Sequence, residues 1–98
     1  MFMFIALKMN PMWQKIENQL RTELTFRNFT EAFAFMTEIA MIAEKQGHHP
    51  TWTNTWNKVS ISLSTHEAGN VVTNRDRELA DAIEKVYQKY VVEEEVLA

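Results

Sequence analysis

The sequence predicts an α+β fold, a two-layer sandwich in which a four-stranded antiparallel sheet carries two helices on one face, in the order β-β-α-β-β-α. Residues 20–26 and 59–65 alternate apolar and polar side chains, as half-buried strands do. Residues 28–46 and 73–90 instead repeat apolar side chains every three or four positions, as amphipathic helices do. Because each helical segment follows a pair of strand-like segments, antiparallel hairpins covered by helices explain this order best.

The first predicted hairpin lies near the start of the chain. Residues 13–17 form a short strand anchored by Trp13, and residues 20–26 form a longer one. One face of the longer strand carries Leu20, Thr22, Leu24 and Phe26. Asn18 and Gln19 lie between the two strands, so they are predicted to form the turn.

The strongest helix signal covers residues 28–46. Asn28 can cap this helix, with Glu31 three residues later, and Thr30 is the alternative cap. Gly47 follows where a helix ending favours a residue that tolerates a left-handed backbone. The apolar stripe consists of Phe29, Ala32, Phe33, Met36, Ile39, Ala40 and Ala43.

The second predicted hairpin pairs residues 51–56 with residues 59–65, joined by a turn at Asn57 and Lys58. The inward face of the second strand carries Val59, Ile61 and Leu63. His66 shares the parity of the opposite face, which carries Lys58, Ser60, Ser62 and Ser64. The alternation therefore predicts that His66 lies at the end of a strand, on its polar face.

A connection over residues 67–72, with Gly69 and Asn70 as turn residues, leads to the final helix. Thr73 is predicted to cap this helix, and Asp76 three residues later completes a capping box. The apolar stripe of this helix consists of Leu79, Ile83, Val86, Tyr87 and Tyr90.

Length and composition indicate a single domain. The 98 residues carry a net charge of −3 and contain no cysteine, a pattern that favours neither nucleic-acid nor membrane binding and excludes thiolate metal sites. We expect a folded domain over residues 12–92, an acidic tail over 93–98 and a loosely ordered lead over 1–11. The lead has only seven apolar residues in a row, whereas a spanning helix needs about 20. We expect a cytoplasmic protein, because a chain without cysteine agrees with a reducing compartment.

All three histidines of the chain, His48, His49 and His66, fall within 19 positions of one another. Histidine titrates near neutrality and is the usual carrier of protons in catalysis. If the loop at residues 48–50 folds over the sheet, the imidazoles converge on one small ligand. The side chains expected to orient that ligand or to form its apolar wall are Ser64, Thr65 and Trp52.

Two other interpretations compete with acid–base catalysis. Three histidines suffice for a zinc site with an open position, but adjacent histidines on an extended backbone point to opposite sides, which makes joint ligation awkward. The other interpretation is purely structural, with loop histidines that solvate a turn and a histidine that ends a strand. Composition alone does not separate these alternatives.

The spacing between the histidines and their neighbouring residues favours one of these three interpretations. The chain resembles the signature of the pterin-4a-carbinolamine dehydratase family, whose positions here are Glu44, His48, His49, Pro50, Trp56, His66 and Asp76. The predicted two-layer fold agrees with that of the family, although many members carry an additional N-terminal helix for which residues 1–11 look too short. Many members also have Asp immediately before the two histidines, whereas this chain has Gly47. Only the backbone of Gly47 can then contact a substrate.

The resemblance implies a hydro-lyase that converts 4a-hydroxytetrahydropterin to quinonoid dihydropterin, with neither a metal nor a cofactor. It implies that His49 and His66 act as the acid–base pair and that His48 holds the pterin. It further implies that Glu44 and Asp76 orient the histidines or bind pterin edges. The residues expected to bind substrate are Gly47, Trp52, Ser64, Thr65 and Glu67.

An alternative function is a non-catalytic dimerisation module, because animal members of the family also act as cofactors of a transcription factor, bound through helices. The resemblance also suggests an aromatic amino acid hydroxylase as a partner. Phe35 and Ile42 widen the apolar stripe of the first helix, which indicates that this helix faces both the sheet and something else. Since the family assembles by joining sheets and packing helices, we expect a homodimer or homotetramer.

Overall fold

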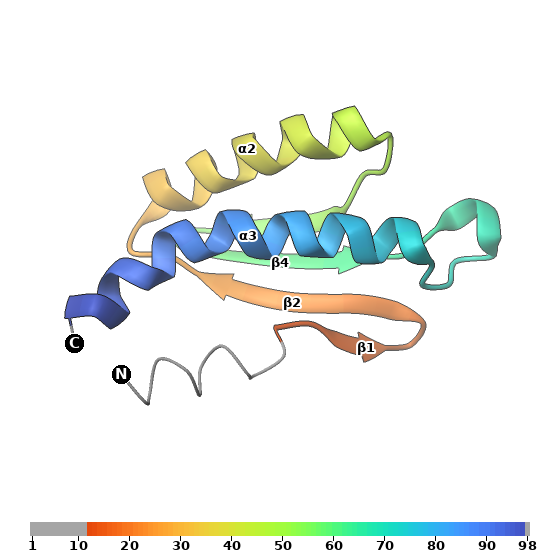
Figure 1. Ribbon diagram of the computed structural model, residues 1–98, viewed down its shortest axis with the longest axis horizontal. Helices are drawn as coiled ribbons and strands as arrows, with labels where there is room; N and C mark the ends of the chain where they lie inside the picture. The colour runs from red at the N-terminus through yellow and green to blue at the C-terminus, as the bar shows by residue number, and fades with distance from the viewer. Residues whose placement is uncertain (1–11, 98) are drawn as a thin grey trace.

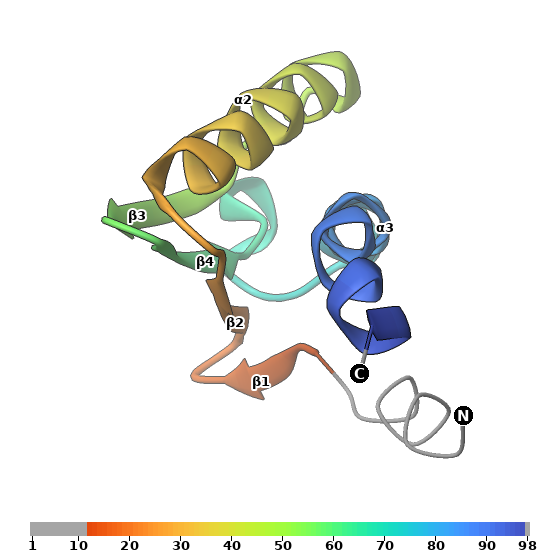
Figure 2. The ribbon, with the colours of Figure 1, turned by 90° about the vertical axis from the view of Figure 1, so that its left-hand side faces the viewer.

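The computed structural model describes residues 12–97, so the predicted lead over residues 1–11 lies outside the described residues. The elements are β1 (Gln14–Ile16), β2 (Gln19–Thr25), α2 (Phe29–Gln46), β3 (Thr51–Thr55), β4 (Lys58–Leu63), the short 3-10 helix η1 (His66–Ala68) and α3 (Asn74–Leu97). The strands form one antiparallel sheet in the order β1-β2-β4-β3. Both helices lie on the same side of this sheet and pack against each other (Figures 1 and 2). The predicted α+β sandwich is confirmed.

Both hairpin turns lie one residue earlier than the sequence predicts. Glu17 and Asn18 connect β1 to β2, with φ values of 52° and 64°. Two consecutive positive φ values match the twist of a tight hairpin, and Asn tolerates this region well. In the second hairpin Thr55 pairs with Lys58, so Trp56 and Asn57 form the turn. The side-chain amide of Asn57 donates to the carbonyl of Phe26 over 2.8 Å, which ties this turn to the end of β2.

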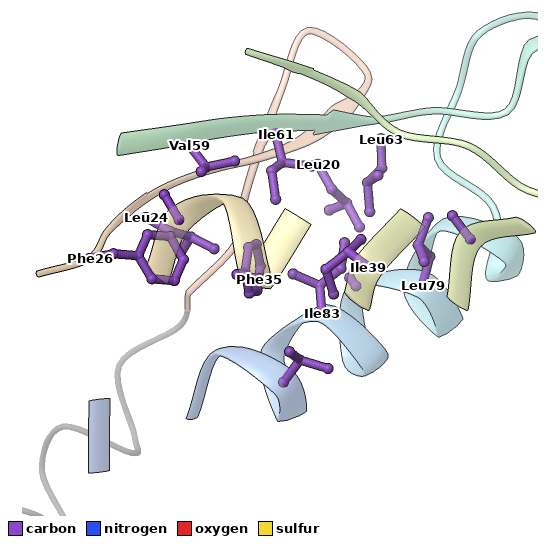
Figure 3. Close-up of a cluster of buried hydrophobic side chains, with 14 residues drawn as sticks. Leu20, Leu24, Phe26, Phe35, Ile39, Val59, Ile61, Leu63, Leu79 and Ile83 are labelled. Atoms are coloured by element: carbon purple, nitrogen blue, oxygen red, sulfur yellow. The ribbon is translucent and has the colours of Figure 1, made fainter. Parts of the chain in front are cut away.

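The core fills the space between the sheet and the two helices (Figure 3). Its buried residues are Leu20, Leu24, Phe26, Ala32, Phe35, Ile39, Ala43, Val59, Ile61, Leu63, Leu79, Ala80, Ile83 and Val86. The inward face predicted for β4 is confirmed, because alternate side chains of this strand are buried. Both predicted helical stripes contribute to the core, so burial of apolar surface on one face stabilises each helix.

The orientation of α2 differs from the predicted one. Phe35 and Ile39 are fully buried, whereas Phe29 and Phe33 are 49% and 56% exposed. Phe35 turns inward because it packs on Phe26, with ring centroids 4.9 Å apart. Apolar residues occupy more of α2 than the core can cover, so the sequence stripe alone did not define the buried face. The rings of Phe29 and Phe33 lie 5.9 Å apart on the outside of the helix.

The predicted helix caps are confirmed. The side chain of Asn28 accepts a 2.9 Å hydrogen bond from the Glu31 amide at the start of α2. Before α3, the Thr73 amide donates to Asp76 Oδ2 over 2.8 Å, as a capping box requires. The backbone of α3 continues to Leu97, so residues 93–97 of the predicted acidic tail are helical.

Candidate active site

The loops that carry the histidines meet the start of α3 at one end of the molecule, on the right in Figure 1. There α2 ends at Gly47, whose φ of 67° is the left-handed conformation expected of a C-terminal glycine. The His48 amide donates to the Ala43 carbonyl over 3.1 Å, which closes the last turn. This ending directs the chain from α2 toward α3 and delivers His48 to the buried side of the loop.

Asp76 is the centre of a buried hydrogen-bond network. Its side chain is fully buried, and His48 is only 7% exposed. His48 Nε2 lies 2.6 Å from Asp76 Oδ1. The other carboxylate oxygen, Oδ2, accepts hydrogen bonds from the Thr65 hydroxyl and the Thr73 amide, each over 2.8 Å. One carboxylate on α3 therefore holds the loop after α2 and the loop after β4 together.

The network also determines the charge of this carboxyl group. Burial alone would raise the pKa of Asp76, but hydrogen bonds from His48, Thr73 and Thr65 outweigh burial and hold the pKa below its ordinary value. Asp76 is therefore ionised at neutral pH and can only accept hydrogen bonds. It follows that Nε2 of His48 carries a hydrogen and donates it to Asp76.

His49, the next residue, lies on the exposed side of the same loop. Its Nε2 is 2.9 Å from Oε1 of Glu44, and both side chains are largely exposed. An ionised carboxylate accepts, so Nε2 of His49 donates and Nδ1 is left for another partner. The expected contact between Glu44 and a histidine is therefore present, in the last turn of α2.

His66 does not lie at a strand end on the polar face, so that prediction is wrong. The ladder of β4 ends where its neighbours end, at the pairs Leu20–Leu63 and Thr51–Ser62. With no strand left to pair with, the chain turns into η1, which His66 begins. His66 is exposed, and its Nδ1 lies 3.2 Å from Oδ1 of Asn70.

Comparison with known proteins identifies the family. A family model described as Pterin 4 alpha carbinolamine dehydratase matches residues 4–86. The chain belongs to this family. Two relatives from Prochlorococcus marinus, provisionally named pterin-4-alpha-carbinolamine dehydratases, are 48% identical over 79 residues (strain MIT 9515) and 45% identical over 80 residues (strain NATL2A). The first match covers 81% of each chain, and the second covers 82% of this chain and 83% of the relative.

Solved structures agree with this assignment to the dehydratase family. A transcriptional coactivator/pterin dehydratase from Brucella melitensis matches with a TM-score of 0.76 and 36% identity, over 87% of this chain and 92% of that chain. A pterin dehydratase-like protein described as a RuBisCO assembly factor in the alpha-carboxysome gives a TM-score of 0.63 and 21% identity, over 76% and 86% of the two chains. At this lower identity the second comparison shows the fold alone.

Not every residue expected to bind the pterin is available for that role in this dehydratase-family chain. Thr65 is only 4% exposed, and its hydroxyl donates to Asp76. A hydroxyl has one hydrogen, so the hydroxyl of Thr73, 2.6 Å away, must donate to Thr65. We correct the expectation for Thr65, which supports Asp76 and has no hydrogen left for a substrate. Ser64, beside it, is partly exposed.

Trp52 has a different environment from the one expected. It pairs with Ile61 across the sheet, so it belongs to the helix-covered face and packs partly buried against the core. A groove of about 580 Å³ lies on the opposite, open face of the sheet. Its lining includes Arg21, Glu23 and Ser60 together with part of Trp52, and none of the three histidines.

Gly47 and Glu67 both contact Arg75, for which the sequence predicted no role. The Arg75 guanidinium donates to the Gly47 carbonyl and lies near the Glu67 carboxylate. The signal for Arg75 in the sequence was its position immediately before Asp76, one of the family's signature positions.

Two further properties concern the described residues alone. Within residues 12–91, whose side chains the structure describes, no three side chains of His, Cys, Asp or Glu gather in a way that could hold a metal ion. Over residues 12–97, no helix combines the length and apolar character needed to cross a bilayer.

Proposed function

We propose that the protein is a hydro-lyase that dehydrates 4a-hydroxytetrahydropterin to quinonoid dihydropterin. In this reaction the C4a–O bond breaks, and the oxygen takes a proton from a general acid and leaves as water. The lone pair of N5 forms the N5–C4a double bond, and the N5 proton passes to a general base. Hydroxide is a poor leaving group, so positioned acid–base groups speed the reaction by roughly 10²–10⁴-fold.

His49 and His66 are the proposed acid–base pair. Both imidazoles are exposed, and each has one ring nitrogen hydrogen-bonded to a neighbour, Glu44 for His49 and Asn70 for His66. A hydrogen bond to one ring nitrogen orients the imidazole and leaves the other nitrogen free to exchange a proton. Each imidazole therefore keeps one ring nitrogen available for a proton transfer with the pterin.

His48 has a different proposed role from the other two histidines. With its Nε2 engaged by Asp76 and little exposed surface, it offers the substrate at most its remaining ring edge. We assign it to the wall of the site, where the Asp76 contact keeps the loop, and therefore His49, in place. This replaces the broader pterin-holding role that the sequence suggested.

The observation that carries this proposal is the coincidence of the family match with two carboxylate–histidine hydrogen bonds, Asp76–His48 and Glu44–His49. The test is the conversion of carbinolamine generated by an aromatic amino acid hydroxylase, measured at neutral pH above the spontaneous rate. Wild-type protein should accelerate it, and His49→Gln and His66→Gln should each lower the acceleration by on the order of 10²-fold. Lys45→Gln, an exposed change beside the same loop, is the control.

No acceleration by wild-type protein would reject the dehydratase function. Full activity in both histidine variants would reject the assigned residues but keep the reaction. A hydroxylase that produces the carbinolamine is the proposed source of substrate and a candidate partner of the protein.

A second candidate function is a dimerisation or interaction module that acts as a transcriptional cofactor. The observation that favours it is the exposed ring pair of Phe29 and Phe33 on α2, a surface of the kind that helical partners bind. The Brucella melitensis protein is described as both a transcriptional coactivator and a pterin dehydratase. A variant such as Phe33→Lys with full dehydratase activity but no partner binding would separate the two functions.

A further inference from the structure

Arg75 joins the two loops that carry the exposed histidines. It lies in the first turn of α3, beside Asp76. Its Nη2 donates to the Gly47 carbonyl over 2.6 Å, and its Nη1 lies 3.7 Å from Oε1 of Glu67. Gly47 stands two residues before His49, and Glu67 immediately follows His66.

Arg75 and Asp76 hold the same two loops at different depths. Asp76 binds the side chains of His48 and Thr65 in the interior, while Arg75 contacts Gly47 and Glu67 at the surface, with its own side chain 46% exposed. The first turn of α3 therefore contacts each loop twice. Asp76 makes the buried contacts, and Arg75 makes the exposed ones. The contacts of Asp76 are buried and stabilise the fold, whereas the contacts of Arg75 lie where the two loops are exposed.

The chemistry of Arg75 fits this role. The Gly47 carbonyl lies at the C-terminal end of α2, where the helix dipole is negative, so a guanidinium binds it well. This bond orients the peptide plane between Gly47 and His48, and thereby the direction in which the chain reaches His49. The planar guanidinium holds its donors at fixed angles, so it can bind a carbonyl and a carboxylate in one defined arrangement, whereas the donors of a lysine ammonium rotate on a flexible stem.

We propose that Arg75 is a positioning residue, which sets the distance between His49 and His66 so that both reach one pterin. The proposal rests on the proposed dehydratase function. Acid–base catalysis depends steeply on geometry, and a displacement of about 1 Å can lower a rate by about 10²-fold. Loss of Arg75 should therefore lower kcat more than it raises KM, because the binding surface remains while the acid–base geometry loosens.

The test compares Arg75→Ala, Arg75→Lys and the control Arg77→Ala in the carbinolamine assay, with the unfolding midpoint of each variant. Arg77 is exposed two residues further along α3, and among the described residues its side chain makes no hydrogen bond to either loop. We expect Arg75→Ala to lower kcat about tenfold with KM changed less than threefold, and Arg75→Lys to restore part of the loss. Arg77→Ala should match the wild type.

A further readout separates positioning from a general loss of structure. If Arg75 acts through the histidine pair, Arg75→Ala should have little additional effect on kcat once His66 is Gln. If Arg75→Ala unfolds, Glu67→Gln removes only the outer contact and should lower kcat about two- to threefold. Wild-type kcat in Arg75→Ala, or a tenfold loss that persists in the His66→Gln background, would overturn the proposal. An inactive wild-type protein would overturn it together with the dehydratase function.

Discussion

His48 and Asp76 are 28 residues apart in the chain and meet in the interior, with Nε2 of His48 2.6 Å from Oδ1 of Asp76. The pair joins the loop after α2 to the first turn of α3, so it holds together the ends of the two helices that cover the sheet (Figure 1). A buried carboxylate of this kind is stable only when its oxygens are filled with donors. His48, Thr65 and Thr73 supply these donors.

Replacement of Asp76 with Asn should destabilise the fold. An amide offers one acceptor oxygen instead of two and turns an NH₂ group toward His48 or Thr65, both of which donate to Asp76. Disruption of a buried pair of this kind costs roughly 3 kcal/mol of unfolding free energy. Urea unfolding at pH 7 measures the change, with Asp81→Asn on the exposed side of α3 as the control. Equal stabilities of the two variants would contradict the prediction.

The stability of the wild-type protein should fall in acid through Asp76. The pKa of Asp76 in the folded protein lies below its ordinary value of 3.8, so the unfolded chain binds this proton more readily than the folded one. The resulting stabilisation is present above pH 3.8 and is lost as the pH falls through the folded pKa. Unfolding of the wild type and Asp76→Asn from pH 7 to pH 3 should therefore show a stability difference that shrinks on acidification. A constant difference would show that the charge of Asp76 is unimportant.

The three histidines should differ in their contribution to stability. His48→Ala removes a buried imidazole and leaves Oδ1 of Asp76 without its donor, which costs roughly 2–3 kcal/mol. His49→Ala and His66→Ala change exposed side chains and should alter the unfolding free energy by no more than about 0.5 kcal/mol. Thermal or urea unfolding of the three variants provides the comparison, in which each exposed histidine is a control for the buried one.

The fold was predictable because the sheet pattern repeats every two residues and the helix pattern every three to four. Alternation in β4 predicted its buried face, and Asn28 and Gly47 marked both ends of α2. The buried face of α2 was not predictable from the sequence. Phe33 and Phe35 are equally apolar, and only packing on Phe26 distinguishes them.

The candidate site was predictable in its residue types but less so in its contacts. Parity along β4 assigned His66 to a strand face, yet a strand ends where its neighbours end, which a single segment does not reveal. Thr65 and Arg75 interact with residues that lie on other elements, Asp76 and Gly47. These contacts depend on how the start of α3 meets the two loops, which local sequence does not encode.

The outer face of α2 should form a contact between copies of the chain. Phe29 and Phe33 expose about half of their surface as a ring pair, and an apolar patch of this kind is commonly covered by a partner. We expect a homodimer or homotetramer, and Phe33→Lys should weaken its assembly about tenfold or more. Light scattering over a concentration series measures this, with Gln88→Lys on α3 as a charge-matched control. A wild-type monomer at micromolar concentration would contradict the expectation.

The last prediction concerns His49 and His66 as a pair. If they act on one pterin as acid and base, His49→Gln or His66→Gln alone already interrupts the proton transfers, each by on the order of 10²-fold. The double variant should therefore lose much less than the product of the two single losses, and its rate should lie within about tenfold of either single variant. The coupled hydroxylase assay measures all four proteins at neutral pH, after subtraction of the spontaneous dehydration that sets a floor for every variant. A contrary outcome is that the two single losses multiply in the double variant while its rate still exceeds the spontaneous one. In that case the two histidines act independently, and a shared acid–base mechanism is wrong. Because both side chains are exposed and hydrogen-bonded to different neighbours, Glu44 and Asn70, coupling between them would have to pass through the substrate that they share.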